Sequence, residues 1–173
     1  HWEKTTPERV ALTQPLGGGA VRDYNWREVL DQSRRIAAYL QAQGFEPGAR
    51  IAILSKNTAH WLMSDFAIWL AGYVSVPLYP TLAAGTVRQI LEHSGSRLLI
   101  VGKLDGWEGM KPGIPDGLPC IAHPLAPDDV KKSYPAWDAI VAKTPPMTGN
   151  PVRDGDELAT IMYTSGTTGV PKG

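Results

Sequence analysis

The residues best suited to chemistry stand together near the end of the sequence, in a short segment rich in hydroxyl groups and glycines. The glycines let the backbone approach an anion without a Cβ in the way, and successive backbone N–H groups in such a turn form an anion-binding concavity. Hydroxyl and ammonium groups add hydrogen bonds that strengthen when the acceptor is charged. Each of these residue types would have a physical role if the ligand were a polyphosphate. The residues predicted to hold its phosphates are Thr164, Ser165, Gly166, Thr167, Thr168, Gly169 and Lys172.

This segment is not a Walker A loop. The pattern G-x-x-x-x-G-K-[ST], started at Gly166, needs glycine where Pro171 stands and Ser or Thr where Gly173 stands. The ordinary P-loop NTPase interpretation is therefore excluded. A Ser-, Thr- and Gly-rich turn after a strand is also common as a plain turn, so composition alone leaves both interpretations open.

The order of the residues is more specific than their composition. Tyr-Thr-Ser-Gly-Thr-Thr-Gly-Val-Pro-Lys-Gly, from Tyr163 to Gly173, resembles position for position the signature loop of the AMP-forming adenylate enzymes. That superfamily includes acyl-CoA synthetases, peptide-synthetase adenylation domains and firefly luciferase. The resemblance covers about residues 7–101 and 152–173, and the wording Val-Pro-Leu-Tyr-Pro-Thr at 76–81 is closest to long-chain fatty acyl-CoA synthetases.

The resemblance implies a two-step reaction that uses ATP, Mg²⁺ and coenzyme A. A fatty acid attacks the α-phosphate of Mg-ATP to give an acyl-adenylate and pyrophosphate, and the CoA thiol then displaces AMP. The predicted loop residues would hold chiefly the β- and γ-phosphates. The family's magnesium-binding glutamate, ribose-binding aspartate and catalytic lysine are expected beyond residue 173. We therefore predict no catalytic or metal-binding residue in this chain, interpret it as an N-terminal fragment, and expect it to be inactive alone.

Two other functions stay open. One is an aryl- or amino-acid-activating adenylation enzyme of the same superfamily. The other is a non-catalytic nucleotide-binding module that keeps the loop without the rest of the site. A homodimer and a peripheral membrane contact are left open as well, and the expected sheet edges predict self-association of the fragment.

The composition excludes several classes. Lys+Arg and Asp+Glu both number 17, so a nucleic-acid partner, which needs clustered uncompensated cations, is not expected. The single cysteine, Cys120, can form neither an internal disulfide nor a zinc site, which favours the reducing cytoplasm. The most apolar stretch, residues 61–79, contains Asp65 and a proline, so we expect no transmembrane segment.

The first hundred residues alternate between strand-like and helix-like patterns. Asn25 and Glu28 form the pattern of a capping box before a helix, and residues 50–54 and 75–79 are apolar strand candidates. Asn57 or Thr58 begins a second helix through Ala71, and Thr86 with Gln89 predicts a cap on a third. A strand at 97–101 follows. This alternation predicts an α/β fold, with a sheet rich in parallel strands and flanked by helices.

The composition of the sequence changes after residue 101. Residues 102–151 hold nine of the 15 prolines and six of the 18 glycines, which predicts an irregular connector with one short helix near 135–142. Order returns with a strand at 158–163. We therefore divide this partial AMP-binding domain into an α/β unit (1–101), a connector (102–151), and a strand with its phosphate loop (152–173).

The remaining candidates favour structural roles. His60, His93 and His123 share no ligand spacing and are expected on helix surfaces or in loops. The acidic residues near 154–157 are interpreted as a solvated turn. The aromatic residues of the second helix could form an acyl groove, but core packing is the preferred interpretation.

Overall fold

The structure, a computed structural model, describes residues 1–165 and 171–173. Its strands are β1 (Val10–Gly17), β2 (Ala20–Asn25), β3 (Arg50–Leu54), β4 (Val74–Leu78), β5 (Leu98–Val101), β6 (Cys120–Ala122), β7 (Thr164–Ser165) and β8 (Pro171–Lys172). Its helices are α1 (Trp2–Thr5), α2 (Trp26–Gln41), α3 (Ala59–Leu70), α4 (Ala84–Ser94), α5 (Trp107–Met110), α6 (Asp128–Ser133) and α7 (Trp137–Lys143), with a 3-10 turn, η1, at Lys111–Gly113. Within these described residues, no helix combines the length and the apolar character that crossing a membrane requires.

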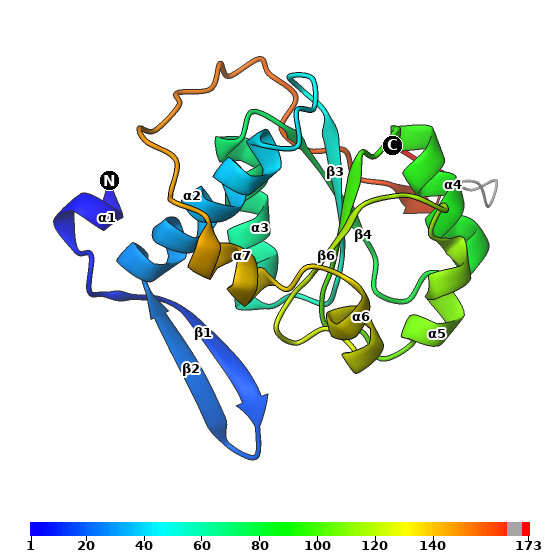
Figure 1. The fold of residues 1–173 in the computed structure, drawn as a ribbon, viewed down its shortest axis with the longest axis horizontal. Coiled ribbons are helices and arrows are strands. Elements are labelled where there is room, and N and C mark those ends of the chain that lie inside the picture. The colour runs from blue at the N-terminus through cyan, green and yellow to red at the C-terminus, as the bar shows by residue number, and fades with distance from the viewer. Residues whose placement is uncertain (166–170) are drawn as a thin grey trace.

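A parallel sheet in the order β4-β3-β5-β6 forms the centre of the fold, with helices on both faces (Figure 1). Alternate side chains of β3 pack into two separate cores. Ile51 and Ile53 face the cluster beneath α2, α3 and α7, whereas Ala52 and Leu54 face the cluster beneath α4, α5 and α6. Strands buried on both faces must be apolar throughout, which explains the uninterrupted apolar run of β3. The predicted α/β class is confirmed.

The local signals at the start of two helices are confirmed. The Glu28 backbone N–H donates to Asn25 Oδ1 at 2.9 Å, and the Asn25 N–H donates to Glu28 Oε2 at 2.9 Å, so the capping box is complete. Thr58 caps α3 by accepting a hydrogen bond from the Trp61 N–H at 3.1 Å. These contacts join residues three apart, which is why sequence alone could locate them.

The predicted cap on α4 is wrong. The helix begins at Ala84, after Ala83 as a cap without a side-chain hydrogen bond, so Thr86 lies inside the first turn. The N–H groups of Thr86 and Val87 both donate to the Ala83 carbonyl. The first turn of the helix is therefore closed by backbone hydrogen bonds to Ala83, and the helix begins two residues before Thr86. The far end of the helix is closed by Gly95, which adopts the left-handed conformation with φ of 62°.

The prediction of an irregular connector at 102–151 is corrected by the structure. This segment supplies β6, which pairs with β5, and three short helices besides. Ile121 and Trp137 are fully buried in one core, and Ala122 and Val130 are fully buried in the other, so the segment completes both cores instead of running over the surface. β6 has three residues, too few for a periodic pattern to reveal it. The short helix expected near 135–142 is present as α7.

The strand predicted at 158–163 forms only one parallel bridge, between Ser75 and Thr160. The Ser75 N–H donates to the Ala159 carbonyl at 3.0 Å, and the Ile161 N–H donates to the Ser75 carbonyl at 2.9 Å. The next residue of β4 whose amide would face this outer edge is Pro77, which has no N–H to donate. The ladder therefore stops after one bridge, and we call residues 151–163 the strap.

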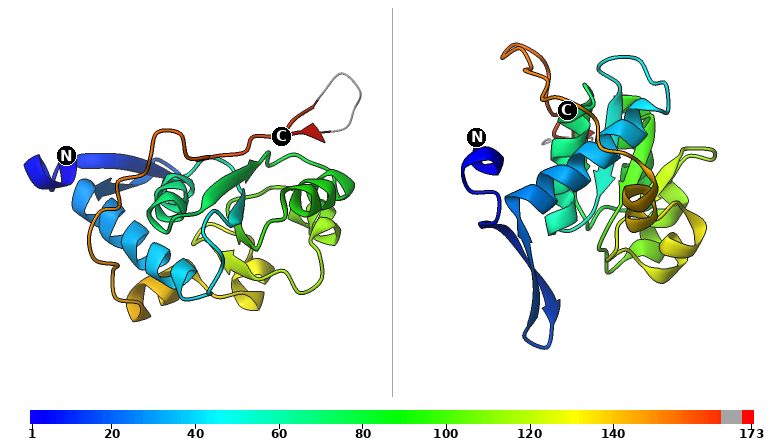
Figure 2. Two further views of the ribbon diagram at one scale, coloured as in Figure 1. Left: turned by 90° about the horizontal axis from the view of Figure 1, so that it is seen from above. Right: turned by 60° about the vertical axis from the view of Figure 1, so that its left-hand side comes forward.

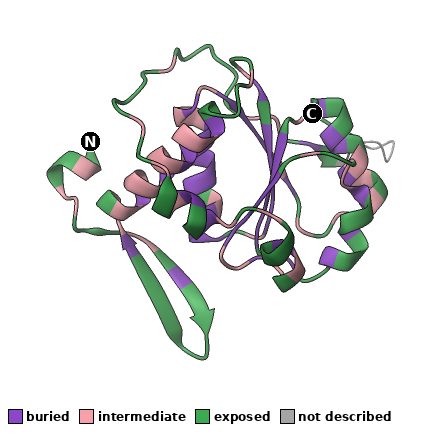
Figure 3. Cartoon of the chain, viewed as in Figure 1, coloured by how far each residue is buried: buried purple, intermediate pink, exposed green. Residues whose placement is uncertain are grey.

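A β-hairpin of β1 and β2 projects from the body of the molecule (Figure 2). Most of its surface is exposed, including the apolar side chains of Val10, Leu16 and Val21 (Figure 3). Gln14 is an exception, because it is buried and its Oε1 accepts a hydrogen bond from the Ala59 N–H at 2.9 Å. One buried amide thus ties the hairpin to the first turn of α3.

Two histidines expected at the surface are buried, which corrects that prediction. His60 and His123 both pack edge-on against the ring of Trp137, with centroids 5.4 and 5.2 Å away. His123 Nε2 pairs with the hydroxyl of Ser64 at 2.8 Å. Burial lowers the pKa of His60 to about 4 and holds the pKa of His123 well below its usual value. Both imidazoles are therefore neutral in the folded protein near pH 7.

These buried histidines predict acid sensitivity. In the unfolded chain they take up protons near pH 6.5, whereas the folded state resists protonation, so stability is lost as the pH falls from about 6.5 towards 4. We expect His60 alone to account for about 2 kcal/mol between pH 7 and pH 5. Urea denaturation at both pH values measures this loss. His60→Gln should reduce the pH dependence by that amount, and an unchanged dependence in the variant would contradict the assignment.

Candidate functional site

Three of the predicted phosphate-binding residues lie in a short antiparallel hairpin that follows the strap. Thr164 and Ser165 lie in β7, Lys172 lies in β8, and Thr164 is the direct cross-strand partner of Lys172. Thr164 and Lys172 are both exposed. Side chains of directly opposed residues project from the same face of a hairpin, so a hydroxyl and an ammonium group stand side by side. The predicted residues Gly166, Thr167, Thr168 and Gly169 lie outside the described residues.

Tyr163 anchors the hairpin to the body of the protein. Its side chain is 5% exposed and packs in the core cluster between the sheet and α4. The Tyr163 hydroxyl and His93 Nδ1 are 2.6 Å apart, and the two rings meet edge-on with centroids 5.6 Å apart. Burial raises the pKa of the Tyr163 phenol, so the hydroxyl stays protonated at neutral pH. The residue directly before Thr164 is thus fixed by packing and by a hydrogen bond.

Gly173 closes the other side of the Tyr163 ring. A Cβ placed on Gly173 would lie 2.8 Å from Tyr163 Cζ and 2.9 Å from Ile161 Cγ2, distances that packed carbon atoms do not tolerate. Only glycine lets the backbone after β8 approach the ring this closely. Both ends of the hairpin therefore meet at Tyr163.

A hollow of about 170 Å³ lies beside this anchor, where β3 and β4 end. In open parallel sheets, ligands bind outside the carboxyl ends of the strands, which is the edge that the hollow occupies. Its walls are mostly apolar and aromatic, and Ser55 and Asn57 are its aliphatic polar residues. The lining residues are Ser55, Asn57, Trp61, Pro77, Leu78, Tyr79, Pro80, Met162 and Tyr163.

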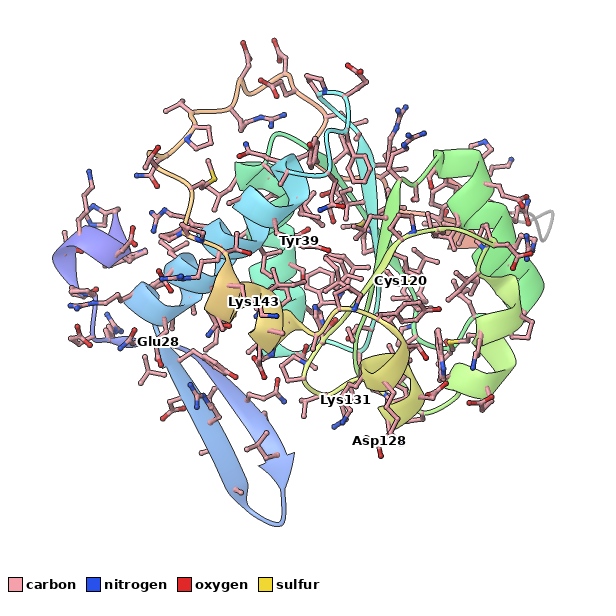
Figure 4. The ribbon with its side chains drawn as sticks, viewed as in Figure 1. Glu28, Tyr39, Cys120, Asp128, Lys131 and Lys143 are labelled. Carbon is pink, nitrogen blue, oxygen red and sulfur yellow. The ribbon has the colours of Figure 1, made fainter. Side chains whose placement is uncertain are left out.

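Other reactive side chains lie away from this edge. Cys120 is buried, and burial raises the pKa of its thiol to about 11, so it is a poor nucleophile at neutral pH. The acidic turn near 154–157 is exposed, and Arg153 forms an ion pair with Glu157 there. Figure 4 shows Asp128 and Lys131 together on α6, where they pair at 2.8 Å. Among residues 1–165 and 171–173, no three His, Cys, Asp or Glu side chains gather closely enough to hold a metal ion.

The anchor of the hairpin could not be predicted from the sequence. His93 had no signal of its own, because its partner Tyr163 stands 70 positions later in the chain. The contact of Trp69 Nε1 with the Ala159 carbonyl at 2.9 Å was hidden for the same reason. Trp69 belongs to neither core cluster, unlike Trp61 and Phe66, and its hydrogen bond holds the strap against α3.

Comparison with known proteins adds independent information. The family model described as AMP-binding enzyme matches residues 1–173. The long-chain-fatty-acid–CoA ligase FadD15 of Mycobacterium bovis is 30% identical over 176 residues, which cover 99% of this chain and 29% of that protein. The fatty acid–[acyl-carrier-protein] ligase ScoC of Streptomyces coeruleorubidus is 33% identical over 154 residues, which cover 88% of this chain and 28% of that protein.

The crystal structure of Brucella canis acyl-CoA synthetase has the same fold, with a TM-score of 0.80 at 22% identity, over 97% of this chain and 30% of that one. The chain thus spans about three-tenths of the length of each of these three proteins.

The close approach of Gly173 yields a matched pair of variants. Gly173→Ala should push the Tyr163 ring out of place and loosen the hairpin, because the added methyl has no room. Hydrogen exchange by mass spectrometry should show faster exchange in peptides covering 159–165. Gly155→Ala is the control, since a Cβ there meets nothing within 4 Å. Equal exchange in both variants would disprove the packing argument.

Proposed function

The chain belongs to the family of AMP-binding enzymes, and we propose that it is the N-terminal part of an ATP-dependent fatty acyl-CoA synthetase. In the proposed reaction the carboxylate oxygen of a fatty acid attacks the α-phosphorus of ATP, and pyrophosphate leaves with the electron pair of the broken P–O bond. The CoA thiol then attacks the acyl carbonyl, loses its proton, and releases AMP. The products are acyl-CoA, AMP and pyrophosphate.

The observation that carries the proposal is the opposed pair of Thr164 and Lys172 on the β7–β8 hairpin. A cation and a hydroxyl on one face suit an anionic oxygen, and Lys172 adds a mobile positive charge. We propose that this pair and the residues between them bind the β- and γ-phosphates of ATP. The full set is Thr164, Ser165, Gly166, Thr167, Thr168, Gly169 and Lys172.

Magnesium enters this proposal as the counterion of ATP. The described residues offer no cluster that suits a metal ion. We therefore propose that the Mg²⁺ ligands, like the catalytic residues, come from sequence beyond residue 173. The task of this chain is to hold the polyphosphate and to form part of the site's wall.

A fatty acid is the proposed carboxylate for two reasons. The Val-Pro-Leu-Tyr-Pro-Thr segment, residues 76–81, resembles that of fatty acyl-CoA synthetases, and its Pro77, Tyr79 and Pro80 line the apolar hollow beside the hairpin. The names of FadD15 and ScoC both specify fatty acids. ScoC uses an acyl-carrier protein by name, so transfer to a carrier-protein thiol is the second candidate.

Pyrophosphate release by the complete enzyme tests the substrate class. We expect release with Mg-ATP and palmitate, but not with benzoate or with single amino acids. Release with benzoate or an amino acid alone would replace the fatty acid by the aryl- or amino-acid-activating alternative. No release with any carboxylate would favour a non-catalytic nucleotide-binding module. Supplying CoA or an acyl-carrier protein in the second step separates the two acceptors.

Lys172→Met tests the phosphate-binding role by removing the ammonium group while keeping an unbranched side chain that is one atom shorter. Losing a charge-assisted hydrogen bond should raise the KM for ATP roughly 10- to 100-fold, with little change in the KM for palmitate. Lys143→Met is the matched control, because Lys143 is an exposed lysine on α7, on the opposite side of the sheet from α4 (Figure 4). An unchanged KM for ATP in Lys172→Met would remove Lys172 from the site.

We also propose that the 173-residue chain makes no acyl-adenylate by itself. The residues assigned to it here bind phosphate, and none of them is assigned to the chemical step. Incubating the purified chain with ATP, Mg²⁺ and palmitate should yield no pyrophosphate above the background. Measurable adenylate formation would place catalytic residues within this chain.

A further inference from the structure

The β7–β8 hairpin has too little pairing to hold its own position. It consists of two residue pairs, Thr164 with Lys172 and Ser165 with Pro171. Isolated two-stranded hairpins are marginally stable in water even when they are longer. The strap before it is bound to β4 at a single bridge, which lies three residues before Tyr163. Something beyond these backbone contacts must fix the hairpin.

The hydrogen bond between His93 and Tyr163 supplies that constraint. The Tyr163 ring is buried, so its hydroxyl needs a partner, and His93 Nδ1 provides one at 2.6 Å. An imidazole nitrogen can either accept from the hydroxyl or donate to its oxygen, so the contact suits both tautomers. His93 itself is exposed and lies in the last turn of α4, whose end is fixed by the left-handed Gly95.

The contact adds a side-chain hydrogen bond to the packing between two elements. On one side is α4, packed on the sheet through Val87, Ile90 and Leu91. On the other side is Tyr163, one residue before Thr164. A shift of the Tyr163 backbone would carry Thr164 away from its place opposite Lys172. The helix therefore holds Tyr163, and with it the start of β7, through this hydrogen bond in addition to core packing.

We propose that His93 is a positioning residue for the ATP site, acting through Tyr163 to hold the β7–β8 hairpin in the geometry that binds polyphosphate. The inference rests on the proposed function, because it assigns ATP to this hairpin. His93 touches no substrate. Its effect is to pre-organise the hairpin, so that less ordering is required when ATP binds.

Because the contact is made by His93 Nδ1, variants can be chosen that either keep or remove this hydrogen bond. Nδ1 is attached to Cγ of the imidazole, and the side-chain amide of asparagine also carries its polar atoms on Cγ. His93→Asn should therefore keep the contact, whereas His93→Ala removes it. Tyr163→Phe removes the same contact from the other side. Gln89→Ala, an exposed position on the same helix, is the control.

The experiment measures ATP binding to the complete enzyme by calorimetry, without any carboxylate, beside the KM values for ATP and palmitate. We expect His93→Ala and Tyr163→Phe each to weaken ATP binding about 3- to 10-fold, the effect of one hydrogen bond. The double variant should be no weaker than either single variant. His93→Asn and Gln89→Ala should bind ATP as the wild type does, and the KM for palmitate should not change.

Three results would overturn the inference. If the wild type binds ATP and His93→Ala binds it equally well, His93 has no positioning role, although the proposed function stands. If His93→Ala weakens ATP and palmitate alike, and His93→Asn restores neither, the role of His93 is general stability. If the wild-type enzyme binds no ATP, the proposed function fails, and the inference fails with it.

Discussion

The structure depends on one constraint, which is that β3 and β5 are buried on both faces. Each strand sends alternate side chains into two cores, and each core needs its own layer of helices. Helices on both faces require crossover connections, so consecutive strands run parallel and their carboxyl ends meet at one edge. The Ser55–Asn57 turn after β3 and the Tyr79–Pro80 corner after β4 border the hollow there. The location of the candidate site thus follows from the burial of the sheet.

A missing hydrogen-bond donor limits pairing along the outer side of β4, an edge strand of the sheet. Ser75 pairs with the strap, but Pro77 has no N–H with which to continue the ladder. The strap is therefore released from β4 and turns into the β7–β8 hairpin instead of becoming a fifth strand of the sheet. The apolar ring of Tyr163 then anchors the released chain, and the polar pair beyond it is left exposed. One proline and one tyrosine together present the hairpin to solvent beside the hollow.

The sequence and the structure agree where neighbouring residues carry the information. The capping box at Asn25, the Thr58 cap and the apolar run at 50–54 each depend on contacts within a few residues. The predictions from the sequence fail where the deciding contact is distant in the chain or the element is short. β6 is a three-residue strand whose place in the sheet depends on β5. His60 and His123 were expected at the surface because their contacts with Trp137 and Ser64, respectively, join residues far apart in the chain.

By itself the sequence determined the α/β class and the family of this protein, because strand alternation, helix caps and an eleven-residue loop are local patterns that survive without a fold. It also named the residues proposed to bind phosphate. Tertiary structure alone decided how that loop is held. His93 meets Tyr163 across 70 positions, and the strap is limited to one bridge by the outward direction of the Pro77 nitrogen. Such contacts depend on how the chain crosses the sheet, which no short stretch of residues encodes.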